Sequence, residues 1–180
     1  MPVSKFIKKM MFSRQLDFKE GKFEMLGIRG AILPIRTLTT FIEEMYKEQG
    51  EDVFDMLFET GKEHGRIGVE KLGKKHSVPK REFLNQIVDS GNIMGLGKAE
   101  IEVFDPSNGN LRIKLEKSPF EEAFKDSEAL DDLERPIDDF QKGIFHAMAD
   151  AVFEKDVKSK QTKCSYLGDQ HCEFKIKTVD

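Results

Sequence analysis

The chain ends with CSYLGDQHCEFKIKTVD, residues 164–180, and this stretch holds both of its cysteines, Cys164 and Cys172. Polar and apolar residues alternate on either side of LGD, residues 167–169, a pattern that predicts a β-hairpin with glycine in its turn. A three-residue turn places Cys164 opposite Cys172 on one face of the hairpin, with their Cβ atoms ~5 Å apart. Two thiols at that separation can share a tetrahedral metal ion, form a strained disulfide, or pack as small core residues.

Two cysteines do not complete a metal site, so the remaining potential ligands matter. The further candidates are Asp138, Asp139, His146, Gln161 and His171. His171 is next to Cys172 in the predicted strand and therefore points to its opposite face. Asp139 and His146 share one helix face with Asp150, an arrangement that is more typical of a solvated surface than of a metal site. The residues alone leave a metal site, a redox pair and inert packing open.

The composition of the 180-residue chain indicates one domain with a core of its own. Hydrophobic residues make up 38%, including 15 Phe and 8 Met, and the net charge is −4. This acidic balance argues against broad binding to nucleic acid, which needs clustered Lys and Arg. No apolar run approaches the ~20 residues that span a bilayer, and residues 1–16 lack the apolar core of a signal peptide. We therefore expect a cytoplasmic protein without a membrane or nucleic-acid partner, whose cysteines are free thiols or metal ligands.

Periodic patterns predict the order of the elements. Besides the last hairpin, alternating residues predict hairpins around turns at 20–21 and 106–109, and the first of these pairs Leu16 with Met25 and Phe18 with Phe23. Helical spacing predicts helices over residues 35–50 and 51–75, from 77–79 onward, from 118 with a Ser118–Glu121 capping box, and over 136–154. This order predicts an α+β fold with a mostly antiparallel sheet packed against several helices. We expect a short amphipathic arm over residues 1–13 and a single domain over 14–180.

Glycines recur every three or four residues in the second predicted helix, at Gly61, Gly65 and Gly68. Each glycine costs ~1 kcal/mol relative to alanine inside a helix. The repeat therefore indicates that another backbone packs closely against this face, or that the helix bends there.

The predicted helix over 136–154 has a wider apolar surface than one core stripe needs, so it is buried on both sides or lines a cavity or a subunit interface. A ligand pocket between the sheet and the helices is expected to be lined by Phe41, Phe58, Met94, Phe145 and Met148. The GLG at 95–97 precedes a strand with no helix after it, so it does not predict a nucleotide-binding loop. No catalytic residues, flavin fingerprint or nucleotide fingerprint are apparent.

Three stretches carry a resemblance to a known family. They are LDFKEGKFEMLGIRGAILP at 16–34, PIDDFQKGIFHAM at 136–148 and QTKCSYLGDQHCEFKI at 161–176. Together they resemble the 4-vinyl reductase (vinyl-4-reductase, hydrocarbon-binding) domain family over residues 14–178. The resemblance implies an α+β ligand-binding fold, shared with nitric-oxide-sensing haem domains and vesicle-tethering subunits, that is commonly dimeric.

The resemblance also implies a metal site. In family members that activate aromatic catabolism, the domain senses phenolic compounds, and zinc is held by the two hairpin cysteines, a preceding Glu and a third Cys. Here Cys164 and Cys172 match the cysteine pair. Gln161 stands in place of the Glu, and Asp138, or less closely Asp139, stands in place of the third Cys. Because neutral Gln is a weak zinc ligand, half of the site is altered, and zinc is the one cofactor that the resemblance implies.

From these observations we expect a domain that binds or senses a small apolar or aromatic ligand and works as a homodimer or with a partner protein, without a DNA-binding segment of its own. One competing interpretation is a reductase or accessory enzyme acting on a vinyl-bearing tetrapyrrole or aromatic, which the lack of a visible hydride source disfavours. Two more interpretations stay open, a dimeric interaction module and a thiol switch formed by Cys164 and Cys172.

Overall fold

The structure is a computed structural model that describes residues 16–25, 27–73 and 79–179. It divides into two compact units, Met1–Pro34 and Ile35–Asp180. The predicted arm over residues 1–13 lies outside the described residues, so the boundary between the arm and the domain stays a prediction. Among the helices of the described part, none is long and apolar enough to cross a membrane.

The first unit contains a small antiparallel sheet formed by β1 (Leu16–Lys19), β2 (Lys22–Met25) and β3 (Ile28–Gly30). Leu16 pairs with Met25 and Phe18 with Phe23, which confirms the predicted register of the hairpin. Gly21 adopts a φ of 70° in the turn, a conformation that glycine reaches without steric strain. The third strand, β3, was not part of the predicted hairpin.

The second unit alternates helices with an antiparallel sheet. Its elements are α2 (Ile35–Gln49), α3 (Asp52–Gly73), α4 (Lys80–Ile93), β4 (Lys98–Asp105), β5 (Asn110–Glu116), α5 (Pro119–Lys125), α6 (Asp139–Phe153), β6 (Val157–Lys163), the short 3-10 helix η1 (Ser165–Leu167) and β7 (Cys172–Thr178). The strands lie in the order β4-β5-β7-β6, and every neighbouring pair is antiparallel. This arrangement confirms the predicted α+β fold.

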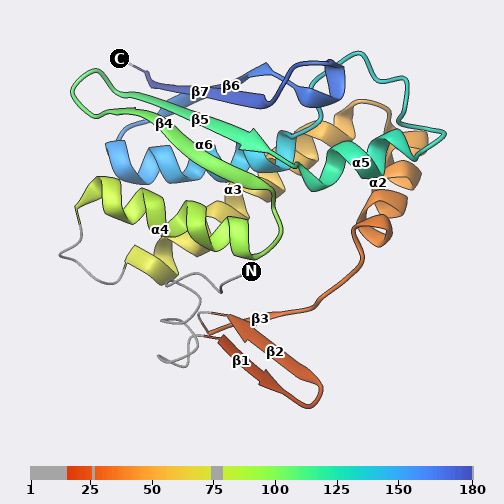
Figure 1. Ribbon diagram of the computed structural model, residues 1–180, viewed down its shortest axis with the longest axis horizontal. Helices are drawn as coiled ribbons and strands as arrows, with labels where there is room; N and C mark the ends of the chain where they lie inside the picture. The colour runs from red at the N-terminus through yellow and green to blue at the C-terminus, as the bar shows by residue number, and fades with distance from the viewer. Residues whose placement is uncertain (1–15, 26, 74–78, 180) are drawn as a thin grey trace. The chain divides into compact units, whose positions relative to one another are not determined.

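The helices of the second unit cover one face of the four-stranded sheet, as Figure 1 shows. Alternate side chains of β5 are buried beneath the helices, with Leu111, Ile113 and Leu115 each at most 1% exposed. Helix α6 lies directly against the sheet, and the ring of Phe145 meets the ring of Phe174 in β7 at 5.1 Å between centroids. The main core therefore lies between the sheet and α6.

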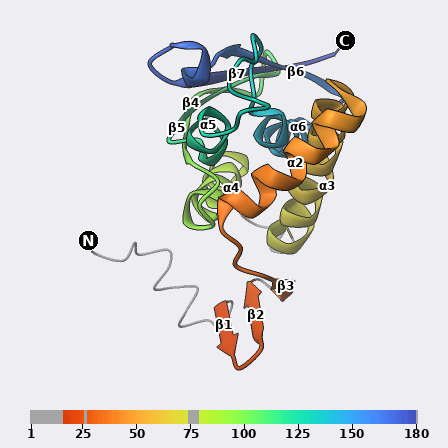
Figure 2. The ribbon, with the colours of Figure 1, turned by 90° about the vertical axis from the view of Figure 1, so that its right-hand side faces the viewer.

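Helix α3 packs against the other side of α6, so α6 is buried between the sheet and a second helix layer (Figure 2). The crossing is close enough that a Cβ at Gly61 would overlap the carbonyl oxygen of Phe140, and one at Gly65 would lie 2.8 Å from that of Ile144. At Gly68, leaving aside its chain neighbours and the backbone of α3 itself, no described residue lies within 4 Å of this position. The close approach predicted from the glycine repeat is confirmed at the first two glycines and wrong at the third, because α3 has passed the contact by Gly68.

Helix α5 begins as predicted, but its capping box does not form. The hydroxyl of Ser118 accepts a hydrogen bond from the backbone N–H of Phe120 at 3.3 Å. The Glu121 carboxylate instead accepts hydrogen bonds from the Ser165 hydroxyl at 2.7 Å and from Lys125 at 3.0 Å. Glu121 therefore ties α5 to the loop between β6 and β7, a contact that no local pattern indicates.

Candidate functional site

The loop between β6 and β7 positions the two cysteines. The ladder ends with Lys163 opposite Glu173, which places Cys164 opposite Cys172 as predicted, but an irregularity between Gln161 and Lys163 shifts the rest of the ladder by one residue from the predicted register. The predicted three-residue turn is wrong, however, because residues 165–167 form η1 and the connection is longer. The Asp169 carboxylate accepts a hydrogen bond from the backbone N–H of Cys164 at 2.8 Å and holds this loop closed.

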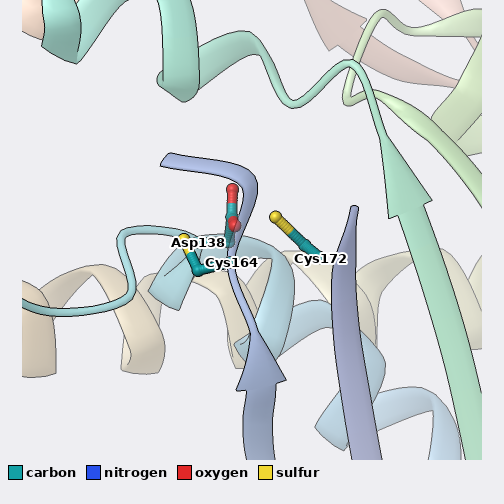
Figure 3. A group of neighbouring side chains, drawn as sticks. All are labelled: Asp138, Cys164 and Cys172. Atoms are coloured by element: carbon teal, nitrogen blue, oxygen red, sulfur yellow. The ribbon is translucent and has the colours of Figure 1, made fainter. Parts of the chain in front are cut away.

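Asp138 completes a buried cluster with the two cysteines. It is the residue before α6, and one carboxylate oxygen and the two Sγ atoms all lie within 4.8 Å of one another. Figure 3 shows the three side chains converging from the start of α6, the end of β6 and the start of β7. All three residues are at most 1% exposed, so the cluster is closed to bulk water.

The hydrogen bonds of Asp138 explain its orientation. Its side chain makes no capping hydrogen bond to α6, although an aspartate in this position commonly does. Instead, one carboxylate oxygen accepts a hydrogen bond from the Ser118 hydroxyl, and the other accepts one from the Gln161 amide nitrogen at 2.7 Å. The same Gln161 nitrogen also donates to the carbonyl of Lys163 at 3.2 Å. Gln161 thus contacts the cluster through Asp138.

The electrostatics of the cluster are those of three acidic groups without a counter-charge. Burial raises the pKa of Asp138. The hydrogen bond with the Cys172 thiol lowers the pKa of Cys164 to about 7, whereas that bond and burial raise the pKa of Cys172. Among the ion pairs of the described residues, none involves Asp138. Two sulfur atoms and one carboxylate oxygen in such a place are a donor set that suits a tetrahedral divalent metal, with a fourth position left for Gln161 or water.

The remaining ligands considered from the sequence lie elsewhere. Asp139 is paired with Arg135 at 2.9 Å and with Lys142. His146 contacts the Ser159 hydroxyl at 3.0 Å and the Asp150 carboxylate at 3.5 Å. The structure thus brings together Asp138, Cys164, Cys172 and Gln161.

A second feature is a small internal cavity of about 20 Å³ between α4, β4 and α6. It is lined by Ile87, Val88, Gly91, Asn92, Leu96, Ala99, Gln141, Ile144, Phe145 and Met148. Most of these side chains are apolar. Its α6 side is fully buried, whereas Gly91, Asn92 and Leu96 are half-buried, so the cavity is nearest to solvent at the connection from α4 to β4.

The residues expected in a ligand pocket are divided by the structure. Phe145 and Met148 line the cavity. Phe41 on α2 is 61% exposed and Met94 after α4 is 43% exposed, so neither belongs to an internal pocket. Phe58 on α3 packs edge-on against the ring of His146 at 5.4 Å between centroids. The spacing of apolar residues in the sequence predicts which residues share an apolar helix face. It does not predict which element packs against that face, because this depends on how the helices pack.

Eight of the ten residues that line the cavity were not among the predicted pocket residues, and two of these eight, Leu96 and Gln141, are informative. Leu96 lies between Gly95 and Gly97, whose φ values of 83° and 108° place its side chain over the cavity. Gln141 is 1% exposed, and among the described residues neither its amide nitrogen nor its amide oxygen has a hydrogen-bond partner. A sequence signal for Gln141 existed, because it interrupts the apolar stripe of α6 four residues before Phe145.

Comparisons with known proteins agree with this geometry. Residues 113–178 match the family model of the vinyl-4-reductase domain. This match confirms the resemblance seen in the sequence. The matched stretch contains α6, β6 and β7 with most of β5, and with them the three residues of the cluster and Gln161. The part of the cavity formed by α4 and β4 lies before it.

Solved structures share the fold over most of the chain. The phenol-responsive sensory domain of the transcription activator PoxR, crystallised with phenol, has a TM-score of 0.84 at 16% identity, covering 98% of this chain and 92% of that one. A trafficking protein particle complex subunit 3 from Naegleria fowleri, covalently bound to palmitic acid, has a TM-score of 0.58 at 12% identity, covering 81% and 95%. A vinyl-4-reductase family protein from Methanocaldococcus jannaschii has a TM-score of 0.53 at 24% identity, covering 84% and 85%. A search of curated proteins found no match.

Proposed function

We propose that this chain binds a small, largely apolar molecule in the cavity between α4, β4 and α6. The observation that carries the proposal is the position of the cavity, which lies inside the fold against the sheet-facing helix and has mostly apolar walls. Cavities with mostly apolar walls inside a fold accept apolar ligands. The similarity to a domain described with phenol and to a subunit described with palmitic acid supports the same role.

Binding would have to widen the cavity. A volume of about 20 Å³ is enough for a water molecule and too small for an aromatic ring. Leu96 and Met148 are the side chains best suited to move, because Leu96 lies on a glycine-flanked turn and the unbranched Met148 has several rotamers. A ligand that favours the widened form shifts the population towards it. The proposed mechanism is thus binding coupled to a change at the α4–β4 connection, without bond chemistry.

Native mass spectrometry of freshly purified protein, beside the same sample denatured, tests this proposal. We expect an organic adduct that is lost on denaturation. In the variant Ala99→Leu, the added carbons enter the cavity and should remove the adduct. The matched control is Ala151→Leu, which adds the same atoms at an exposed position of α6 and should retain it.

Different outcomes would favour a different function. No adduct, together with no mass gain after exposure to a panel of aromatic and aliphatic compounds, would contradict the proposal and favour an interaction module. Consumption of a nicotinamide by the purified protein would indicate a reductase. The native spectra also report the oligomeric state, and the homodimer stays a prediction until they are recorded.

We also propose that the cluster of Asp138, Cys164 and Cys172 binds zinc. The residues fit the ion by donor type, since two thiolates and a carboxylate are common zinc ligands, and by their mutual distances. Gln161 is adjacent to the cluster but is held by Asp138 and Lys163 in the hydrogen-bonded arrangement. A bound zinc ion would neutralise the acidic groups and join the β6–β7 loop to the start of α6.

Metal analysis of protein purified without chelator tests the zinc site. We expect about one zinc per chain in the natural sequence and less than a tenth of that in Cys164→Ser. Asp138→Asn should weaken retention against a chelator, whereas the matched variant Asp139→Asn, outside the cluster, should not. Metal-free natural protein that also fails to take up added zinc would contradict the site. A disulfide that forms reversibly in such protein would favour the thiol switch.

A further inference from the structure

We propose that Gln141 selects ligands by hydrogen bonding to a hydroxyl group, so that the cavity prefers neutral hydroxyl-bearing molecules to hydrocarbons of the same shape. This inference rests on the proposed function, since it names the ligand chemistry of the same cavity. It makes Gln141 the residue that sets specificity.

The first observation is the unpaired amide itself. Gln141 is 1% exposed and lines the cavity, yet its amide nitrogen and oxygen both lack partners among the described residues. Buried polar groups in proteins are nearly always hydrogen-bonded, so each exception needs an explanation. A leucine or methionine at this place on the apolar stripe would avoid the penalty. A ligand group that completes the hydrogen bonds of the amide provides the explanation.

The second observation is that, among the side chains lining the cavity, Gln141 carries the polar group that is still available to hydrogen-bond a ligand. Of the ten residues that line the cavity, all of them described, the other polar side chain is that of Asn92. Both ends of its amide are already paired, since its oxygen accepts from the backbone N–H of Ala99 at 2.7 Å and its nitrogen donates to the carbonyl of Ala99 at 3.0 Å. Asn92 therefore fixes the α4–β4 connection, and Gln141 faces the cavity.

The chemistry of the amide defines the ligand group. A carboxamide offers one acceptor oxygen and a donor nitrogen on the same plane, and a hydroxyl group can donate to the first or accept from the second. None of the ten described lining residues is charged, so a carboxylate or ammonium ligand would be buried without a counter-charge. The walls formed by Ile144, Phe145 and Met148 suit an apolar body. The predicted class is a neutral molecule with an apolar ring or chain and one hydroxyl group.

Calorimetric titration with two ligand pairs tests the inference. Phenol and toluene differ by replacement of a hydroxyl by a methyl group on one ring, and cyclohexanol and methylcyclohexane form the aliphatic pair. We expect the natural chain to bind each hydroxyl compound at least about tenfold more tightly than its partner, the scale of one well-made hydrogen bond in a buried site. Gln141→Met should abolish this preference while keeping affinity for the hydrocarbons. The matched control Gln170→Met, at an exposed position, should keep the preference.

The outcomes separate the inference from the proposed function. Equal binding within each pair, or a preference that survives in Gln141→Met, would overturn the inference and leave the ligand cavity standing; a water molecule satisfying the amide would give this result. If none of the four compounds binds, both fail. The midpoint of thermal unfolding of Gln141→Met should be unchanged or higher, because the variant loses an unpaired buried amide. Gln141→Leu serves as a second variant if the first does not fold.

Discussion

Buried polar side chains near the start of α6 are of two kinds, and the difference indicates what each does. Asp138 is fully buried, and its carboxylate accepts hydrogen bonds from Ser118 and Gln161. Other residues of the same chain therefore satisfy this carboxylate and hold it in place. Gln141, three residues later, is as deeply buried and has no partner in the described part of the chain. A paired polar group specifies the fold, whereas an unpaired one next to a cavity can bind a molecule from outside.

The half-buried histidine of α3, His64, makes stability depend on pH. Burial lowers the pKa of His64, whose ring lies 5.7 Å from that of Phe140 between centroids. Since the folded chain binds this proton less readily than the unfolded chain, the unfolding free energy falls as pH drops below the ordinary histidine pKa of ~6.5. We predict that His64→Gln reduces the loss of stability between pH 7 and pH 5.5, as measured by urea denaturation.

His146 contributes in the same direction, because burial also lowers its pKa while Asp150 opposes the shift. The single variant should therefore retain part of the pH dependence, and a double variant with His146→Gln should lose more of it. The same slope in His64→Gln and in the natural chain would show that His64 is protonated equally in both states.

At the scale of elements, the crossing of α3 and α6 depends on glycine. The absence of side chains at Gly61 and Gly65 on α3 lets the two helix backbones approach. Gly143 does the same from α6, because a Cβ there would overlap the carbonyl oxygen of Phe58 on α3. This approach brings α6 into its position between α3 and the sheet. Since α6 supplies Gln141 and follows Asp138, the glycine contact positions both functional features.

Alanine substitutions in α3 test this crossing with an internal control. We predict that Gly61→Ala lowers the unfolding free energy by about 1–3 kcal/mol, because the new methyl group overlaps the backbone of Phe140. Gly68→Ala should raise it by up to ~1 kcal/mol, because open space surrounds that position within the described structure and alanine favours the helix. Chemical denaturation of both variants measures the two values, and equal changes in one direction would contradict the packing.

At the scale of the whole molecule, the core belongs to one unit. Every residue of the main hydrophobic cluster lies within Ile35–Asp180, and so do the metal-binding candidates and the cavity. The small sheet of residues 16–30 forms its own hydrogen bonds. The second unit therefore has what a domain needs to fold alone.

We predict that a chain beginning at Ile35 folds cooperatively and binds the same ligands as the full chain. Circular dichroism should show one thermal transition within ~3 °C of that of the full chain, a shift that corresponds to about 1 kcal/mol for a domain of this size. Loss of ligand binding in a folded truncation would show that the first unit takes part in the binding function.

The sequence alone determined the features that depend on neighbours along the chain. The turn at Gly21 fixed the pairing of Phe18 with Phe23, and the alternation around the last turn placed Cys164 opposite Cys172. At the first hairpin a two-residue turn and a period of two leave one register, whereas at the last one the predicted opposition of the cysteines holds although the connection is longer than three residues. The family resemblance then added Asp138 and Gln161 as partners of the cysteines.

Tertiary structure decided which surfaces meet. Phe41 and Phe145 both lie on apolar helix faces, yet one is exposed and the other faces the cavity, because burial depends on which element packs against each face. Gln141 carries no local mark of being unpaired, since its hydrogen bonds can be assessed only when α4 and β4 are in place. Contacts between elements distant along the chain have no period in the sequence, and for that reason the cavity and the unpaired amide that lines it came from the fold alone.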